Sequence, residues 1–152
     1  MSDLAGLSDV LRGVGRVHVD ASVLALHLTG NRRFTPLTRS LFEMLADGTL
    51  SGCTSALSIY QLLAEVYRRG EPETAATAER YLTTIPGLAV IDVTPAVARQ
   101  ASQVRAQLGG STERAVQIAT ALSERAEIYL TQRSAFRRVA GMGVESLDLF
   151  AG

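Results

Sequence analysis

The chain has 152 residues, a length that fits one domain and is sufficient to bury a sizeable core. Its composition, 47% hydrophobic and 20% charged, is that of a folded globular protein and excludes an intrinsically disordered chain. The formal net charge is zero and every basic residue is an arginine, so no overall positive charge attracts the chain to nucleic acid.

Neither a membrane segment nor a disulfide framework is indicated. No apolar run approaches the ~20 residues of a membrane-spanning helix. Residues 1–15 lack the basic-then-apolar layout of a signal peptide, so we expect a cytoplasmic protein with no membrane partner. Cys53 is the single cysteine, which excludes an internal disulfide and a multi-cysteine zinc site.

The first strong structural signal lies near the N-terminus. Residues 1–16 are predicted to be an extension with a short helix, and residues 17–152 to be the folded domain. The run Val17-His18-Val19 predicts a buried strand that ends at Asp20, and apolar residues at helical spacing follow it. Because chemistry in an open parallel sheet collects beyond the carboxyl ends of its strands, Asp20 is the first candidate site residue.

The rest of the chain alternates between helix and strand signals. Further helices are predicted to begin near residues 35, 57, 71, 96 and 112. Strands are predicted at 51–55, 88–93, 127–131 and 144–149, with a helical turn at 136–139. This alternation predicts an α/β fold, a three-layer α/β/α sandwich around a mainly parallel sheet of four to five strands.

Four short stretches carry a family resemblance that extends from Val17 to Leu149. They are the segments 19–22 (Val-Asp-Ala-Ser), 54–63, 115–122 and 129–136. With these stretches in this order, the chain resembles the PIN-domain family and, within it, the VapC-type toxin ribonucleases of bacterial toxin–antitoxin pairs. The resemblance implies a homodimer, an antitoxin-like protein partner and RNA as the nucleic acid bound.

The family's catalytic carboxylates are largely replaced. The resemblance implies three or four acids that hold Mg²⁺ or Mn²⁺ for phosphodiester hydrolysis. Asp20 matches the first acid, whereas Gln61, Arg114 and Arg133 stand where the others are expected. A guanidinium has no lone pair for a metal, and the four positions sum to +1. We therefore expect no metal cofactor and a degenerate active site, as in a pseudoenzyme.

Two nearby acids provide an alternative. Glu65 lies one helical turn after Gln61, and Glu113 immediately precedes Arg114. With Asp20, these two carboxylates would form the metal site of an active Mg²⁺- or Mn²⁺-dependent endoribonuclease. The main hypothesis is instead that catalysis is lost and the protein acts by binding protein partners or RNA.

In the main hypothesis the arginines take over the site. Either Arg114 or Arg133 is expected to form an ion pair with Asp20 in place of the metal. Arg114, Arg133 and Arg137 are the candidate RNA-binding residues, because they would make the former metal site electropositive. Ser22 is expected to cap the helix that follows Asp20.

Overall fold

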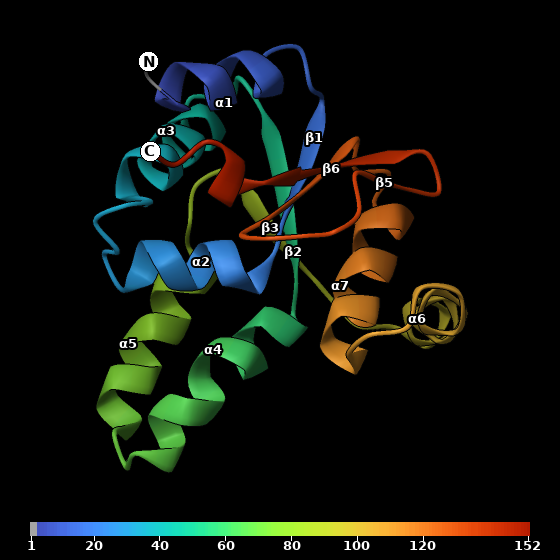
Figure 1. The fold of residues 1–152 in the computed structure, drawn as a ribbon. Coiled ribbons are helices and arrows are strands. Elements are labelled where there is room, and N and C mark those ends of the chain that lie inside the picture. Colours follow the sequence, from blue (N-terminus) through green and yellow to red (C-terminus); the bar gives the residue numbers. More distant parts are fainter. Residues whose placement is uncertain (1–2) are drawn as a thin grey trace.

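The computed structural model describes residues 3–152, which form one six-stranded sheet with helices on both faces (Figure 1). The strand order is β3–β2–β1–β4–β6–β5, and each neighbouring pair is parallel except β5 and β6. The strands are β1 (Arg16–Val19), β2 (Ser51–Ser55), β3 (Leu88–Ile91), β4 (Ile128–Thr131), β5 (Arg138–Val139) and β6 (Met142–Ser146). The predicted three-layer α/β/α sandwich is confirmed, with six strands rather than four to five.

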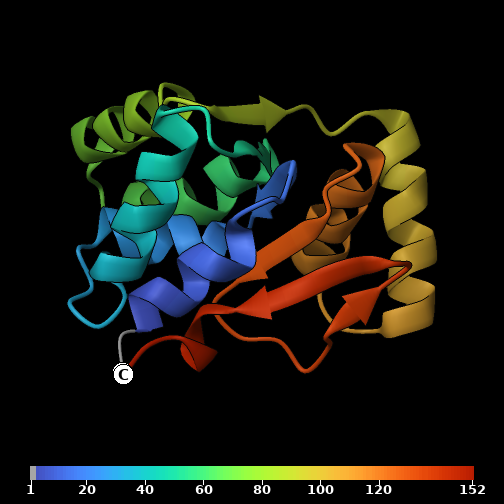
Figure 2. The same ribbon diagram turned by 90° about the horizontal axis from the view of Figure 1, so that it is seen from above.

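Helices cover the sheet from two sides. They are α1 (Asp3–Leu11), α2 (Ala21–Leu28), α3 (Thr35–Ala46), α4 (Leu57–Arg68), α5 (Pro72–Thr83), α6 (Pro95–Leu108) and α7 (Thr112–Ser123). Helices α6 and α7 lie on one face and α1 to α3 on the other, while α4 and α5 form a hairpin that extends beyond the sheet (Figures 1 and 2). Within residues 3–152, we find no helix with the length and apolar character required to cross a membrane.

Each face of the sheet has its own hydrophobic core. Val17 and Val19 of β1 are buried in the core beneath α1, α2 and α3. Tyr129 of β4 lies in the second core, which α6 and α7 cover. Because successive side chains of a strand point to opposite faces, His18 points toward α7 and is completely buried there.

The C-terminal hairpin differs from the sequence prediction. Residues 136–139 do not form the expected helical turn, and the strand expected at 144–149 begins earlier, at Met142. Ala140 and Gly141 have φ angles of 49° and 86°, which gives the two-residue turn typical of a tight hairpin. The sheet therefore gains the edge strand β5, and Leu147–Leu149 form a 3₁₀ helix, η1.

The strand order places a crevice at the end of β1. From β1 the chain first adds β2 and β3 on one side, and then crosses over to add β4 on the other side. The connections diverge at this switch point, which leaves a crevice beyond the carboxyl ends of β1 and its neighbours. Asp20 is the first residue after β1 and its backbone N–H donates to Leu130 O at 2.9 Å, so it lies in this crevice.

The N-terminal helix is packed into the domain core, which gives a first prediction. Leu11 is 1% exposed, whereas Val10 on the same helix is 36% exposed. We expect Leu11→Ala to lower the free energy of unfolding by about 2–5 kcal/mol, because the leucine leaves a cavity. Val10→Ala is the matched control and should change it by less than about 0.5 kcal/mol. Urea denaturation measures both, and equal effects would contradict the packing described.

Candidate functional site

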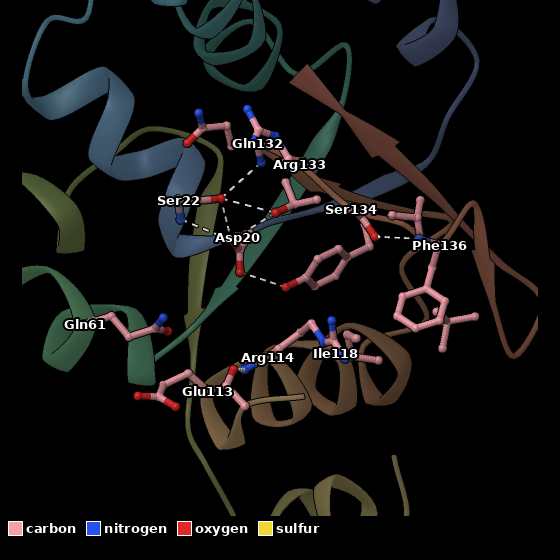
Figure 3. A pocket seen from close by; sticks show the side chains of 15 residues that line it. Asp20, Ser22, Gln61, Glu113, Arg114, Ile118, Gln132, Arg133, Ser134 and Phe136 are labelled. Carbon is pink, nitrogen blue, oxygen red and sulfur yellow. Dashed lines mark hydrogen bonds between the residues drawn. The ribbon is translucent and has the colours of Figure 1, made fainter. Parts of the chain in front are cut away.

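A pocket of about 320 Å³ lies at the carboxyl end of β1, and we call it the Asp20 pocket (Figure 3). All four positions that correspond to family acids line it: Asp20, Gln61, Arg114 and Arg133. Residues far apart in the sequence therefore converge on one site, as the resemblance implies. Glu113 also lines the pocket, whereas Glu65 does not.

The Asp20 carboxylate is surrounded by neutral hydrogen-bond donors. The Tyr129 hydroxyl donates to Oδ1 at 2.7 Å, and the Thr131 hydroxyl donates to Oδ2 at 3.2 Å. Ser22 donates twice to Oδ2, from its backbone N–H at 3.1 Å and from its hydroxyl at 2.5 Å (Figure 3). Burial and the Asp20 charge raise the pKa of Tyr129 well above its usual value, so the phenol remains a donor. Three of these bonds converge on Oδ2 and saturate it, whereas Oδ1 accepts one bond and keeps a second lone pair.

Asp20 also begins helix α2. Its extended backbone and the bond from Ser22 N–H make it the N-cap residue of Ala21–Leu28. The prediction that Ser22 caps this helix is therefore wrong. The Ser22 hydroxyl instead links the carboxylate to the chain after β4, because it accepts a hydrogen bond from the Gln132 backbone N–H at 3.1 Å.

The expected ion pair between Asp20 and an arginine does not form in the part of the chain that the structure describes. Arg133 Nε donates to Asp148 Oδ2 at 2.6 Å. The Arg114 guanidinium donates to the Gly109 carbonyl at 3.0 Å and lies 5.2 Å from the centre of the Phe136 ring. Uncharged donors satisfy Asp20 instead, so neither arginine is needed to neutralise it.

Gln61 is held by a buried chain of polar side chains. Gln117, which is fully buried, donates from Nε2 to Gln61 Oε1 and to Ser58 Oγ, both at 2.8 Å. The Gln117 Oε1 in turn accepts a hydrogen bond from His18 Nε2 at 2.7 Å, which places the imidazole proton on Nε2. His18 Nδ1 lies 3.7 Å from Cys53 Sγ, and its ring stacks on Tyr129 with centroids 5.1 Å apart. The oxygen of Gln61 is thereby engaged in the protein interior.

The donor set of this site does not fit Mg²⁺ or Mn²⁺. Asp20 Oδ2 is saturated and only Oδ1 has a free lone pair, while the Gln61 oxygen already accepts from Gln117. Arg114 and Arg133 have no lone pair to contribute and would repel a dication. Within residues 3–152, we find no group of three or more His, Cys, Asp or Glu side chains that could hold a metal ion.

The alternative ligand Glu65 lies away from Asp20. It faces a separate groove between α2, α4 and α5, is exposed, and accepts hydrogen bonds from Arg68 Nε at 2.9 and 3.1 Å. These bonds lower the pKa of Glu65 below its usual value. Of the two substitutes considered, only Glu113 shares the pocket with Asp20.

Sequence reasoning missed the residues that complete the site. Tyr129 and Thr131 lie two residues apart on the strand beside β1, so they share one face of the sheet. The spacing of two polar side chains on one face of this strand was the sequence signal that could have identified them as partners of Asp20. Gln117 was the second signal, because a glutamine among the apolar residues of an α7 face must find a buried partner.

Comparisons with known proteins concern the fold of the chain. The PIN domain family model matches residues 17–142. A VapBC2 complex from Rickettsia felis bound to promoter DNA superposes with a TM-score of 0.68 and 14% identity, over 86% of this chain and 98% of that chain. A DNA-bound VapBC from Salmonella typhimurium superposes with a TM-score of 0.68 and 17% identity, over 88% of this chain and 98% of that chain.

A third solved structure of similar fold is that of a toxin. The Mycobacterium tuberculosis toxin VapC20, described as cleaving the sarcin-ricin loop, gives a TM-score of 0.59 and 18% identity, over 74% of this chain and 86% of that chain. None of the curated proteins compared matches the sequence. At these identities the structural likeness shows the fold.

The buried histidine makes stability depend on pH. Burial lowers the pKa of His18 from 6.5 to about 4, while the Gln117 hydrogen bond and the Asp20 charge oppose that shift. Below pH 6.5 the His18 imidazole takes up a proton in the unfolded chain but not in the folded chain, so protonation favours unfolding. The free energy of unfolding is therefore unaffected by His18 above pH 6.5. It decreases by about 3 kcal/mol as the pH falls from 6.5 to 4.

Urea denaturation at a series of pH values measures this effect. Between pH 6.5 and 4, the loss of stability should be clearly smaller in His18→Gln than in the wild type. His27→Gln is the matched control and should keep most of the loss, because His27 is only partly buried. The same pH dependence in His18→Gln and the wild type would contradict a neutral buried His18.

Proposed function

The chain belongs to the PIN domain family, and from that premise we propose that it is a VapC-like protein that binds its targets without hydrolysing them. The observation that carries the proposal is that Gln61, Arg114 and Arg133 line the pocket around Asp20, at the positions where the other family acids are expected. The two guanidiniums have no lone pair to offer a metal ion and would repel a dication. The Gln61 oxygen is already engaged by Gln117.

Reversal of the substitutions tests this proposal. Because positions 20, 61, 114 and 133 line one pocket, the variant Gln61→Glu/Arg114→Asp/Arg133→Asp should gain Mn²⁺ binding and Mn²⁺-dependent cleavage of single-stranded RNA. Calorimetry and denaturing gels measure the two gains. Asp20→Asn added to the triple variant is the control, and it should remove both. The wild type should show neither.

The alternative function has a distinct outcome in the same experiment. If the protein is an active ribonuclease that uses Asp20 with Glu65 and Glu113, the wild-type protein would cleave RNA in the presence of Mn²⁺. The Asp20→Asn variant would lose that activity. The presence of Glu113 beside Asp20 in the pocket is the observation that favours it. Such cleavage would overturn the proposal of a binding protein.

We propose an antitoxin-like protein as the main partner. A groove of about 800 Å³ between α2, α4 and α5 has walls that include Leu28, Leu62, Val66 and Tyr81. A largely apolar groove between helices suits the apolar face of an amphipathic helix. Two of the structures compared above are VapBC complexes, and a toxin–antitoxin complex from Klebsiella pneumoniae is also similar in fold. Gln61 lines both this groove and the Asp20 pocket, so the two cavities adjoin.

A charged side chain in the groove tests this partner. Thr77 is exposed and lines the groove, whereas Thr83 is exposed on the same helix outside it. We expect Thr77→Arg to weaken the complex with an antitoxin-like partner protein by at least about tenfold, and Thr83→Arg to leave it intact. Calorimetry on the co-expressed partner measures both. Equal affinity of the two variants would contradict docking in this groove.

We also propose that two copies of the chain associate. Tyr60 and Tyr67 lie seven residues apart on α4 and are 61% and 52% exposed, so they form an uncovered aromatic face. Analytical ultracentrifugation should find a dimer for the wild type and a monomer for Tyr60→Ser/Tyr67→Ser. A monomeric wild type would exclude the homodimer.

A further inference from the structure

Two opposite charges at the start of α7 line the Asp20 pocket without an ionic partner. Glu113 and Arg114 are neighbours in the first turn of α7, are both half-buried, and lie below Asp20 in the view of Figure 3. None of the six ion pairs found within residues 3–152 includes either side chain. The pocket therefore holds one carboxylate and one guanidinium that are both available to a ligand.

The Arg114 guanidinium is held in place but keeps most of its donors. Of its five N–H groups, the described contacts use one, from Nη2 to the Gly109 carbonyl at 3.0 Å, while its face lies 5.2 Å from the centre of the Phe136 ring. Its charge opposes the rise in the pKa of Tyr129 that burial and the Asp20 charge cause, so it lies near the hydroxyl that binds Asp20. A positioned guanidinium with free N–H groups suits a carboxylate, which it can bind through two parallel hydrogen bonds.

Acceptors for a positively charged group lie in the same pocket. Glu113 contributes a carboxylate with no ionic partner, and Asp20 Oδ1 accepts one hydrogen bond and keeps a second lone pair. The other arginines expected at this site do not compensate these acids, because Arg133 pairs with Asp148 at 2.6 Å and Arg137 does not line the pocket. Free carboxylate oxygens suit an ammonium group, which has three N–H donors.

The rest of the lining is apolar, and the pocket is small. Ile118 of α7, Phe136, Val139 of β5 and Val144 of β6 contribute hydrocarbon surface. The volume of about 320 Å³ is near the lower end of the range of about 300–1,000 Å³ typical of small-molecule pockets. A pocket of this size suits a metabolite with a short apolar part.

The two free charges restrict the charge of that ligand. Half-buried charged groups are costly unless a partner compensates for the water that they lose. An anion would satisfy Arg114 and leave Glu113 unpartnered, and a cation would do the reverse. A zwitterion satisfies both groups at once, because it presents a carboxylate and an ammonium group together.

We propose that the Asp20 pocket binds a free α-amino acid with an apolar side chain. Its carboxylate accepts hydrogen bonds from Arg114, its ammonium group donates to Glu113 and to Asp20 Oδ1, and its side chain contacts the apolar part of the lining that includes Ile118. The inference goes beyond the proposed function, because it assigns a small-molecule ligand to the pocket and requires neither a protein partner nor RNA.

Calorimetry in EDTA with L-leucine and L-phenylalanine tests the ligand class, and we expect at least one of them to bind with a Kd below about 1 mM. For L-leucine, the matched ligands are 4-methylpentanoate, which lacks the ammonium group, and 3-methylbutylamine, which lacks the carboxylate. Each should bind at least about tenfold more weakly, because one charge of the pocket stays unpartnered. Glycine should be weaker by a similar factor, because it buries no apolar side chain.

Three outcomes of these titrations would overturn the proposal. Absence of binding by both amino acids would exclude the site, and equal affinity for either singly charged ligand would exclude recognition of a zwitterion. Equal affinity for glycine would exclude the apolar contact.

Substitutions locate the bound amino acid. We expect Arg114→Gln and Glu113→Gln each to weaken its binding by at least about tenfold, because each removes one charged partner. Arg99→Gln on α6 and Glu43→Gln on α3 are the matched controls, since both residues are exposed and lie outside the pocket. They should bind within about twofold of the wild type, and equal losses in variants and controls would overturn the assignment.

The proposed function is tested separately. Denaturing gels of RNA in Mn²⁺ report on hydrolysis, whereas the amino-acid titrations are carried out in EDTA without RNA. Cleavage of RNA by the wild type would overturn the proposed function and leave the titration results standing.

Discussion

The structure around the site depends on how one carboxylate at the end of the central strand is satisfied. Asp20 lies at the switch point of the sheet, where a half-buried charge is costly unless it is compensated. Four neutral donors compensate it, and they come from the start of α2 and from β4. The same four bonds cap α2 and fasten it to β4 beside β1. The carboxylate that matches a family acid thus has a structural role in this fold.

The other replaced acids have acquired partners of their own. Gln61 is tied to the interior through Gln117 and His18, and Arg133 is tied to Asp148 on η1. As a result the Asp20 pocket is formally balanced, because its lining holds Asp20 and Glu113 together with Arg114 and Arg133. A pocket of balanced charge does not concentrate the negative charge that would hold a divalent cation.

The sequence predicted the fold well and the contacts of the site poorly. Helical spacing located α3 and α4, and the order of strands and helices indicated the layered architecture. The choice of partner for Asp20 depended on β4, because Tyr129 and Thr131 reach it only once that strand is paired with β1. Long-range pairing of this kind is not encoded in local periodicity. The hairpin of β5 and β6 was missed for a local reason, since Ala140 adopts a left-handed turn that alanine rarely occupies.

The most direct test of the central claim is a calorimetric titration of Mn²⁺ into the wild-type protein and into Asp20→Ala. If the replacement of the other family acids leaves Asp20 without partner ligands, neither protein should bind Mn²⁺ in the micromolar-to-millimolar range. Binding by the wild type that disappears in Asp20→Ala would contradict the account. It would show that the carboxylate can exchange its hydroxyl donors for a metal ion, and it would restore Glu113 as a candidate second ligand.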